Sequence, residues 1–130
     1  MKRAIILIDH GSTVAEANAV LEDVAALLRR LATVPVFTAH MELAEPSALS
    51  AFAAAVASGA DEVVVHPYFL APGRHSTADI PRLVAAAAAP FPHVRWRVTP
   101  PLGPDRRLAE LVMQRVGADE PIAVGGGNGR

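Results

Sequence analysis

The sequence predicts an α/β fold in which an open, parallel four-stranded sheet carries helices on both faces. Hydrophobic residues switch repeatedly between the spacing of strands and the three- and four-residue spacing of helices. Two of the four expected strands are apolar almost throughout, as is typical of strands in the middle of a parallel sheet. With 130 residues and 52% hydrophobic content, the chain can bury one core of its own.

The first strand is expected at the apolar run Ala4–Ile8. Asp9 and His10 end this run well before it reaches the length of a signal peptide or a membrane segment. Gly11 follows, and a glycine lets backbone and ligand approach closely. A long amphipathic helix is expected next, with an inward stripe formed by Val14, Ala17, Leu21, Val24, Leu28 and Leu31.

The second unit pairs a strand at Val34–His40 with a helix that Pro46 is expected to open. Proline is preset for the first turn of a helix, which is why we place the helix start there. Gly59 is expected to end the helix. The inward residues are expected to be Leu49, Phe52, Ala53 and Val56.

The third unit has a strand at Val63–Val65 and a helix for which Asp79 is the expected N-cap. Pro81 follows at a position that suits the first turn, and Pro90 and Pro92 stop the helix. The inward stripe of this helix is expected to be Ile80, Leu83, Val84 and Ala87.

The fourth expected strand alternates between apolar and polar residues, which predicts one buried face and a place at the edge of the sheet. Gly103-Pro104-Asp105 then starts a last helix. We expect a single domain over residues 1–117 and a flexible glycine-rich tail over residues 118–130. Within this tail, Gly125–Gly129 superficially resembles a phosphate loop, but no helix is expected after it to supply a positive dipole. The apolar residues concerned are Val94, Trp96 and Val98 in the strand, and Leu108, Leu111, Val112 and Val116 on the inward face of the helix.

The balance of charge and the absence of cysteine exclude several classes of function. Twelve basic residues stand against 13 acidic ones, so net charge predicts no attraction to nucleic acid or to a membrane surface. An anionic ligand must therefore be met by local cations. The chain has no cysteine, which excludes disulfides, thiolate metal sites and cysteine nucleophiles and agrees with a cytoplasmic location.

Several residues with reactive side chains follow the ends of the expected strands. In a parallel sheet these ends lie at one edge, here called the carboxyl edge, where open α/β folds bind their ligands. His10 follows the first strand, His40 and Glu42 the second, and the loop at residues 67–76 the third. Two histidines and a carboxylate at one edge suit a borderline divalent metal that keeps open coordination positions.

The histidines admit different interpretations. For His66 and His93, within or next to a strand, we favour a structural role, whereas His40 is equally compatible with a structural role and a ligand role. His75 lies in a long loop with Gly73 and Arg74 just before it, which favours a functional role. Tyr68-Phe69-Leu70 leaves a buried strand and either packs in the core or presents a flat face to a ligand.

Four motifs at successive strand ends resemble the small CbiX/SirB-type class II chelatases, and the match runs from about Lys2 to Val116. The resemblance implies ATP-independent insertion of Co²⁺, Fe²⁺ or Ni²⁺ into sirohydrochlorin or a related tetrapyrrole, by a homodimer of flavodoxin-like halves and without a nucleotide. The sequence departs from the family pattern at Thr13, where many relatives carry arginine. The motifs are Asp9-His10-Gly11-Ser12, the segment from Ala39 to Ser47, the segment from Pro67 to His75 with Asp79-Ile80-Pro81, and Pro101-Leu102-Gly103.

The resemblance also implies roles for individual residues. The family histidines that match His10 and His75 hold the metal, and the glutamate that matches Glu42 lies near the site. Glu42 is our candidate base for a pyrrole proton, with the two histidines as alternatives. Arg74 is the first candidate to bind the carboxylates of the macrocycle, with Arg82 and Arg106 as alternatives. Other candidate contacts to the macrocycle are Ser12, Tyr68, Phe69 and Leu70.

A planar tetrapyrrole has two broad faces, whereas a four-stranded domain offers one edge. We therefore expect a symmetric homodimer with the site between subunits. Two alternatives remain open: a non-catalytic carrier of metal or tetrapyrrole, and a phosphohydrolase in which His10 is phosphorylated. Against the phosphohydrolase, Asp9 rather than an arginine precedes His10.

Overall fold

The computed structural model describes residues 1–73, 76–119 and 121–127 and shows the predicted parallel sheet. The strand order is β2-β1-β3-β4 and every neighbouring pair is parallel. The apolar first and third strands are central and the alternating fourth strand lies at the edge, as predicted. The strands are β1 (Arg3–Asp9), β2 (Val36–His40), β3 (Glu62–Pro67) and β4 (Arg95–Val98).

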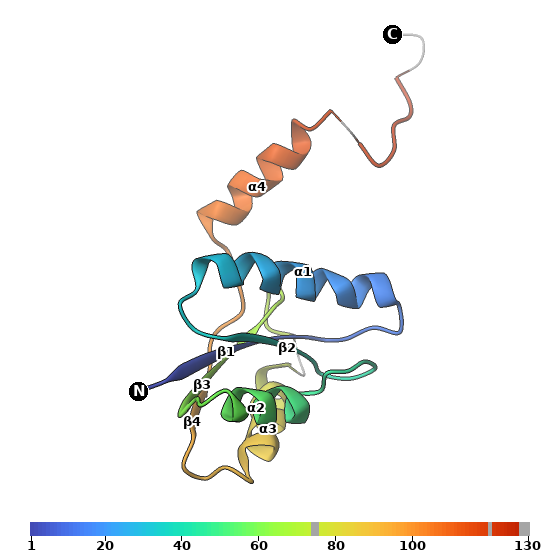
Figure 1. Ribbon diagram of the computed structural model, residues 1–130. Coiled ribbons are helices and arrows are strands. Elements are labelled where there is room, and N and C mark those ends of the chain that lie inside the picture. Colours follow the sequence, from blue (N-terminus) through green and yellow to red (C-terminus); the bar gives the residue numbers. More distant parts are fainter. Residues whose placement is uncertain (74–75, 120, 128–130) are drawn as a thin grey trace.

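Helices cover both faces of the sheet (Figure 1). Helix α1 (Ala15–Leu31) packs on one face, against β1 and β2. Helices α2 (Ala48–Ala57) and α3 (Ser76–Ala88) pack side by side on the other face, and Phe52 is among the most deeply buried side chains there. The smaller core on the α1 side is formed by Leu7, Leu21, Ala25 and Val36.

The predicted inward stripes of α1 and α2 are partly wrong. In α1, Leu21 is buried, but Val14 lies at the N-cap and Leu31 is the last helical residue, so both are exposed, as is Ala17. In α2 the N-cap is Ser47 rather than a helix start at Pro46, and the inward face includes Phe52 but excludes the exposed Leu49 and Ala53. The buried residues of α2 are Ala48, Ala51, Phe52 and Ala55.

Helix α3 begins earlier than predicted. It starts at Ser76, so Asp79 lies in the first turn instead of capping it, and Pro81 lies inside the helix. The sequence predicts a cap at Asp79, two residues before Pro81, although the chain is already helical at that point. The inward residues Ile80, Val84 and Ala87 are buried as predicted.

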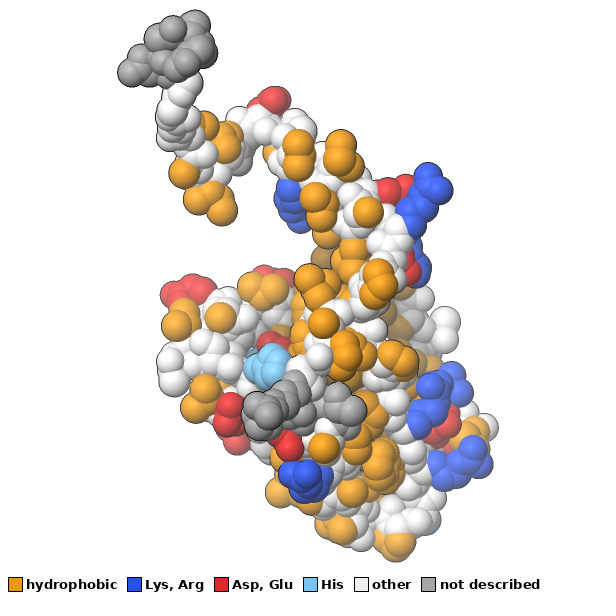
Figure 2. Space-filling view, turned by 180° about the vertical axis from the view of Figure 1, so that it is seen from behind, with side chains coloured by type: hydrophobic (Ala, Val, Ile, Leu, Met, Phe, Trp, Pro, Cys, Tyr) orange, Lys and Arg blue, Asp and Glu red, His pale blue; other side chains and the backbone are white. Residues whose placement is uncertain are grey.

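Helix α4 (Arg106–Val116) is amphipathic as predicted, but its apolar face is not packed against the sheet. Figures 1 and 2 show the helix projecting from the body, with hydrophobic side chains along it. Leu111, Val112 and Val116 are exposed, which corrects the expectation that they point inward. The segment Pro100–Pro104 turns the chain outward before the helix begins. The spacing of apolar residues shows that one face is apolar, but does not say what covers it.

Within the described ranges, no helix combines the length and the apolar character needed to cross a lipid bilayer. Residues 121–127 contain neither helix nor strand.

Candidate functional site

A pocket of about 630 Å³ opens at the carboxyl edge between the ends of β1 and β2 and helix α3. It brings together His10 and Glu42, which the sequence placed at this edge. Helix α3 adds Arg82 and Asp79, the residue that was expected to cap this helix. We call it the edge pocket; its lining residues are His10, Met41, Glu42, Asp79, Arg82, Leu83 and Ala86.

His10 is the first residue after β1, and an aromatic contact orients its ring. The imidazole stacks on Phe69, with ring centroids 4.6 Å apart and an interplanar angle of 21°. Phe69 follows β3, the neighbour of β1, so the contact joins two strand ends. Among the described residues, neither ring nitrogen of His10 has a hydrogen-bond partner. The ring is therefore held in place while its nitrogens remain available to bind a metal or a proton.

Glu42 is held beside His10 through the backbone. The amide of Met41 donates to the Asp9 carbonyl at 2.8 Å, and the amide of Glu42 donates to the His10 carbonyl at 3.2 Å, which continues the pairing of β1 and β2 past their ends. Gly11 has a φ of 87°, and a Cβ there would overlap the Glu42 carbonyl oxygen. Only glycine fits this close approach.

The side chain of Glu42 is exposed, and within the described part of the chain no other side chain pairs with its carboxylate. The next residue, Leu43, has a φ of 70°, the only positive value among the described non-glycine residues. Such a conformation persists where surrounding structure imposes it, and it is common at functional sites. The carboxylate is therefore presented on a constrained turn and remains available as a base.

His40 points away from the edge pocket. Its Nδ1 atom lies 2.5 Å from Oδ1 of Asp9, and the two side chains are 5% and 20% exposed. Both residues lie on the α1 side of the sheet, as Thr38 does, whose hydroxyl donates to Glu22 of α1 at 2.9 Å. This placement favours the structural interpretation of His40 over the ligand interpretation.

The three apolar residues after β3 separate. Tyr68 packs against the core on the α1 side, Phe69 packs on the opposite side, and Leu70 is exposed. Phe69 also lines a second pocket of about 280 Å³, so its ring contacts His10 and this second hollow. The second pocket is lined by Pro67, Phe69, Pro72, Pro81, Val98, Thr99, Pro100 and Pro101.

Ser12 forms part of the turn that leads into α1. Its oxygen accepts from the Val14 amide at 2.9 Å, and its backbone exchanges two hydrogen bonds with the side chain of Asn18. The Ser12 hydroxyl has no acceptor among residues 1–73, 76–119 and 121–127, so its hydrogen can be donated to a ligand.

Among the candidate cations, Arg82 lines the edge pocket and pairs with Asp79 at 3.0 Å. Arg106 lies on α4, where it pairs with Glu110 at 3.6 Å. Arg74 and His75 lie outside the described residues. Within the described residues, no three His, Cys, Asp or Glu side chains come close enough together to hold a metal ion.

The remaining histidines lie away from the edge pocket. Nδ1 of His66 is 2.7 Å from the Thr99 hydroxyl, and burial lowers the pKa of His66 below its ordinary value. This matches the predicted structural role. His93 is exposed in the turn before β4.

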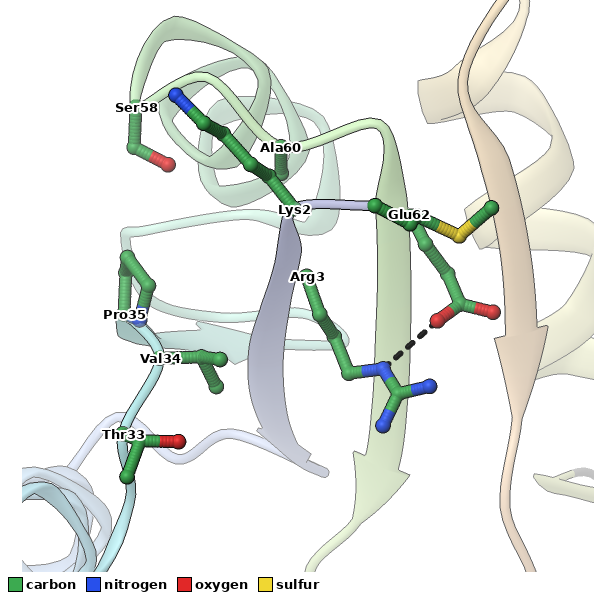
Figure 3. A pocket seen from close by; sticks show the side chains of 9 residues that line it. Lys2, Arg3, Thr33, Val34, Pro35, Ser58, Ala60 and Glu62 are labelled. Carbon is green, nitrogen blue, oxygen red and sulfur yellow. Dashed lines mark hydrogen bonds and ion pairs between the residues drawn. The ribbon is translucent and has the colours of Figure 1, made fainter.

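A further pocket, of about 480 Å³, lies at the opposite edge, where the strands begin (Figure 3). Figure 3 shows Arg3 directed to Glu62, whose Oε1 lies 2.7 Å from Arg3 Nε, while Lys2 extends toward Ser58. Arg3 lowers the pKa of the Glu62 carboxyl below its ordinary value. Sequence reasoning missed this pocket, because no motif marks it.

A profile of the CbiX family matches residues 4–119, which include β3, β1 apart from its first residue, and every described residue of the edge pocket. The chain belongs to the CbiX family. It is 45% identical over 113 residues to the chloroplastic sirohydrochlorin ferrochelatase of Arabidopsis thaliana, covering 86% of this chain and 50% of the plant protein. It is 31% identical over 134 residues to the sirohydrochlorin cobaltochelatase of Methanopyrus kandleri, covering 87% of this chain and 94% of that protein.

Among solved structures, SirB from Bacillus subtilis with Fe³⁺ superposes with a TM-score of 0.83 at 30% sequence identity. The match covers 91% of this chain and 48% of SirB. This CbiX-family chain thus spans about half the length of SirB and of the plant ferrochelatase, and nearly the whole length of the archaeal cobaltochelatase.

Proposed function

We propose that this chain inserts a divalent metal ion, Co²⁺, Fe²⁺ or Ni²⁺, into sirohydrochlorin or a related tetrapyrrole without a nucleotide. The observation that carries the proposal is that His10 and Glu42 line one pocket at the carboxyl edge, in a chain of the CbiX family. The names of the ferrochelatase and cobaltochelatase relatives support the substrate and two of the metals.

The reaction requires two exchanges at the same place. The metal ion enters the macrocycle as four pyrrole nitrogens replace its former ligands, and two pyrrole N–H protons leave. A neutral imidazole suits the delivery, because one or two histidines hold a borderline divalent ion less completely than a closed four-ligand site. We assign this role to His10 together with His75.

We assign to Glu42 the role of accepting a proton from a pyrrole N–H group. Its carboxylate is exposed, lacks a side-chain partner among the described residues and lines the same pocket as His10. A carboxylate at this place can accept a proton from a pyrrole nitrogen. Phe69 and Leu70 would contact the macrocycle, and Arg74 or Arg82 would bind its carboxylates. Ser12 and Tyr68 remain candidates at the margin of the site.

The two alternative functions, a carrier and a phosphohydrolase, each make a different demand on the protein. A carrier would bind metal or tetrapyrrole without accelerating insertion. A phosphohydrolase would need cations around His10 to bind phosphate, whereas Arg82 is the one cation among the described lining residues and is paired with Asp79.

The test is anaerobic spectrophotometry of Co²⁺, Fe²⁺ and Ni²⁺ insertion into sirohydrochlorin, compared with the enzyme-free rate. We expect acceleration by the wild type and its loss in His10→Ala and in His75→Ala. His93→Ala is the matched control: it removes another exposed imidazole, in the turn before β4 begins, and should retain the wild-type rate. Wild-type binding with no acceleration for any ion would favour the carrier.

We further propose a homodimer with the site between subunits. The chain spans about half of SirB, and α4 leaves the carboxyl edge with an exposed apolar face. Light scattering should show a dimer that Leu111→Glu dissociates, because a buried charge opposes association. Leu31→Glu is the control, since Leu31 is 83% exposed at the far end of α1. A wild-type monomer that remains fully active would contradict the proposal.

We also propose a cytoplasmic location, consistent with a chain that contains no cysteine. Cell fractionation would test it.

Residues 118–130 are proposed to be a flexible tail outside the domain, so that truncation after Gly117 should leave the insertion rate unchanged.

A further inference from the structure

The side chains of Asp9 and His40 contact each other where β1 and β2 end, next to the loops that lead into the edge pocket. The two residues are register partners, and each is the final residue of its strand. The imidazole is almost completely buried, with Nδ1 2.5 Å from the carboxylate. An ionised carboxylate only accepts hydrogen bonds, so Nδ1 carries the hydrogen and donates it.

Each partner leads directly into a residue of the pocket. Asp9 precedes His10, and His40 precedes Met41 and Glu42 by one and two residues. The backbone of the same two residues is also engaged: the Asp9 carbonyl accepts from the Met41 amide at 2.8 Å, and the His40 amide donates to the Pro46 carbonyl at 2.8 Å. The contact therefore lies at the base of both loops that carry the proposed metal ligand and the proposed base.

The contact lies on the opposite face of the sheet from the pocket. Side chains alternate along a strand, so Asp9 points to the α1 side while His10 points to the side of α3. Neither Asp9 nor His40 lines the edge pocket. Their effect on the site must pass through the backbone.

We propose that Asp9 and His40 are positioning residues that fix Glu42 relative to His10. This rests on the proposed function, in which Glu42 receives a pyrrole proton while His10 presents the metal. Glu42 is exposed, and the next residue, Leu43, has a left-handed backbone conformation. Such a conformation is held by the structure around it, which here includes the ends of β1 and β2 at Asp9 and His40. Displacements of about 1 Å between reacting groups lower rates by about 10²-fold.

The experiment compares steady-state insertion kinetics of the full chain with Asp9→Asn, His40→Gln and His40→Asn. Asp9→Asn keeps the shape and removes the charge, and His40→Gln moves the amide donor to the place of Nε2. Both should lower kcat at least tenfold while KM for the macrocycle stays within about twofold. His40→Asn places its amide nitrogen where Nδ1 was, so it should restore most of the wild-type kcat.

Thr38→Val is the matched control. It removes the hydrogen bond from β2 to Glu22 on the same face, two residues before His40 and away from the pocket. We expect it to lower the thermal midpoint without a loss of kcat. The double variant Asp9→Asn/His40→Gln should be no slower than the slower single variant, because both remove one contact.

The proposal is overturned if Asp9→Asn and His40→Gln retain kcat within twofold of the wild type. It is also overturned if Thr38→Val loses as much kcat as they do for an equal fall in thermal midpoint, since the effect would then be general destabilisation. A wild type no faster than the enzyme-free reaction would instead refute the proposed function, and that comparison is made first.

Discussion

The two edges of the sheet both carry a pocket lined by charged residues, but the charges are used differently. At the amino edge, the Arg3 guanidinium and the Glu62 carboxylate satisfy each other at 2.7 Å. At the carboxyl edge, the described structure gives the Glu42 carboxylate no side-chain partner and the His10 nitrogens no hydrogen bond. Charged groups without internal partners are the ones free to meet a ligand.

The helices reinforce this difference. Helices α1 and α2 end next to the amino-edge pocket, where Thr33 and Ser58 contribute to its lining. The partial negative charge of helix C-termini favours cations nearby, so the positive charges of Lys2 and Arg3 suit the ends of α1 and α2. The carboxyl edge is where α1, α2 and α3 begin. The comparison teaches that charged lining residues indicate a ligand site where they lack side-chain partners, as Glu42 does among the described residues, more than where they pair with each other, as Arg3 and Glu62 do.

The largest effect is expected from Glu42→Gln at the carboxyl edge. The amide keeps the size of the side chain but is a poor proton acceptor, so kcat should fall by about 10²–10⁴-fold. Metal and macrocycle affinities should change little, which separates a lost base from lost binding. Single-turnover insertion with saturating Co²⁺ measures this. A kcat unchanged in Glu42→Gln would remove the main distinction between the two edges.

The second prediction compares one glycine at each edge. Gly11→Ala forces a Cβ into the Glu42 carbonyl and should lower the free energy of unfolding by more than about 2 kcal/mol. Gly59 has a φ of 101°, but a Cβ there meets only Lys2 Cδ at 3.9 Å, so Gly59→Ala should cost about 1 kcal/mol. Urea denaturation measures both, and equal losses would show that the crowding at Gly11 is relieved elsewhere.

The smallest effect is expected from Arg3→Gln at the amino edge. Because Arg3 lowers the pKa of Glu62 in the folded protein, this pair stabilises the fold above the ordinary pKa near 4.5. The stabilisation is lost as pH falls through the lowered folded value. Arg3→Gln should therefore unfold at a higher pH on acid titration, followed by circular dichroism, with an unchanged insertion rate at neutral pH. A slower insertion rate would indicate a link between the two edges.

Much of the fold and part of the site could be predicted from the sequence. Continuous apolar runs separate central strands from the alternating β4, and strand ends in a parallel sheet share one edge, so His10 and Glu42 could be placed together. The direction of His40 could not be predicted, because a residue at a strand end can face either side. The position of α4 could not be predicted either. Hydrophobic spacing shows that one face of this helix is apolar, but not which surface covers that face.

Asp79 and Arg82 show another limit. Their sequence spacing indicates a helix pair, but only the three-dimensional packing of α3 against the edge brings them to the pocket. A capping signal before a proline competes with the intrinsic helicity of the preceding residues, and here the helix had already begun at Ser76.

Phe69 contributes to two neighbouring parts of the carboxyl edge. Its ring stacks on His10, which lines the edge pocket, and the same residue lines the proline-rich second pocket next to β4. Shortening this side chain would therefore do more than release the His10 ring, because it would also remove part of the lining of the second pocket.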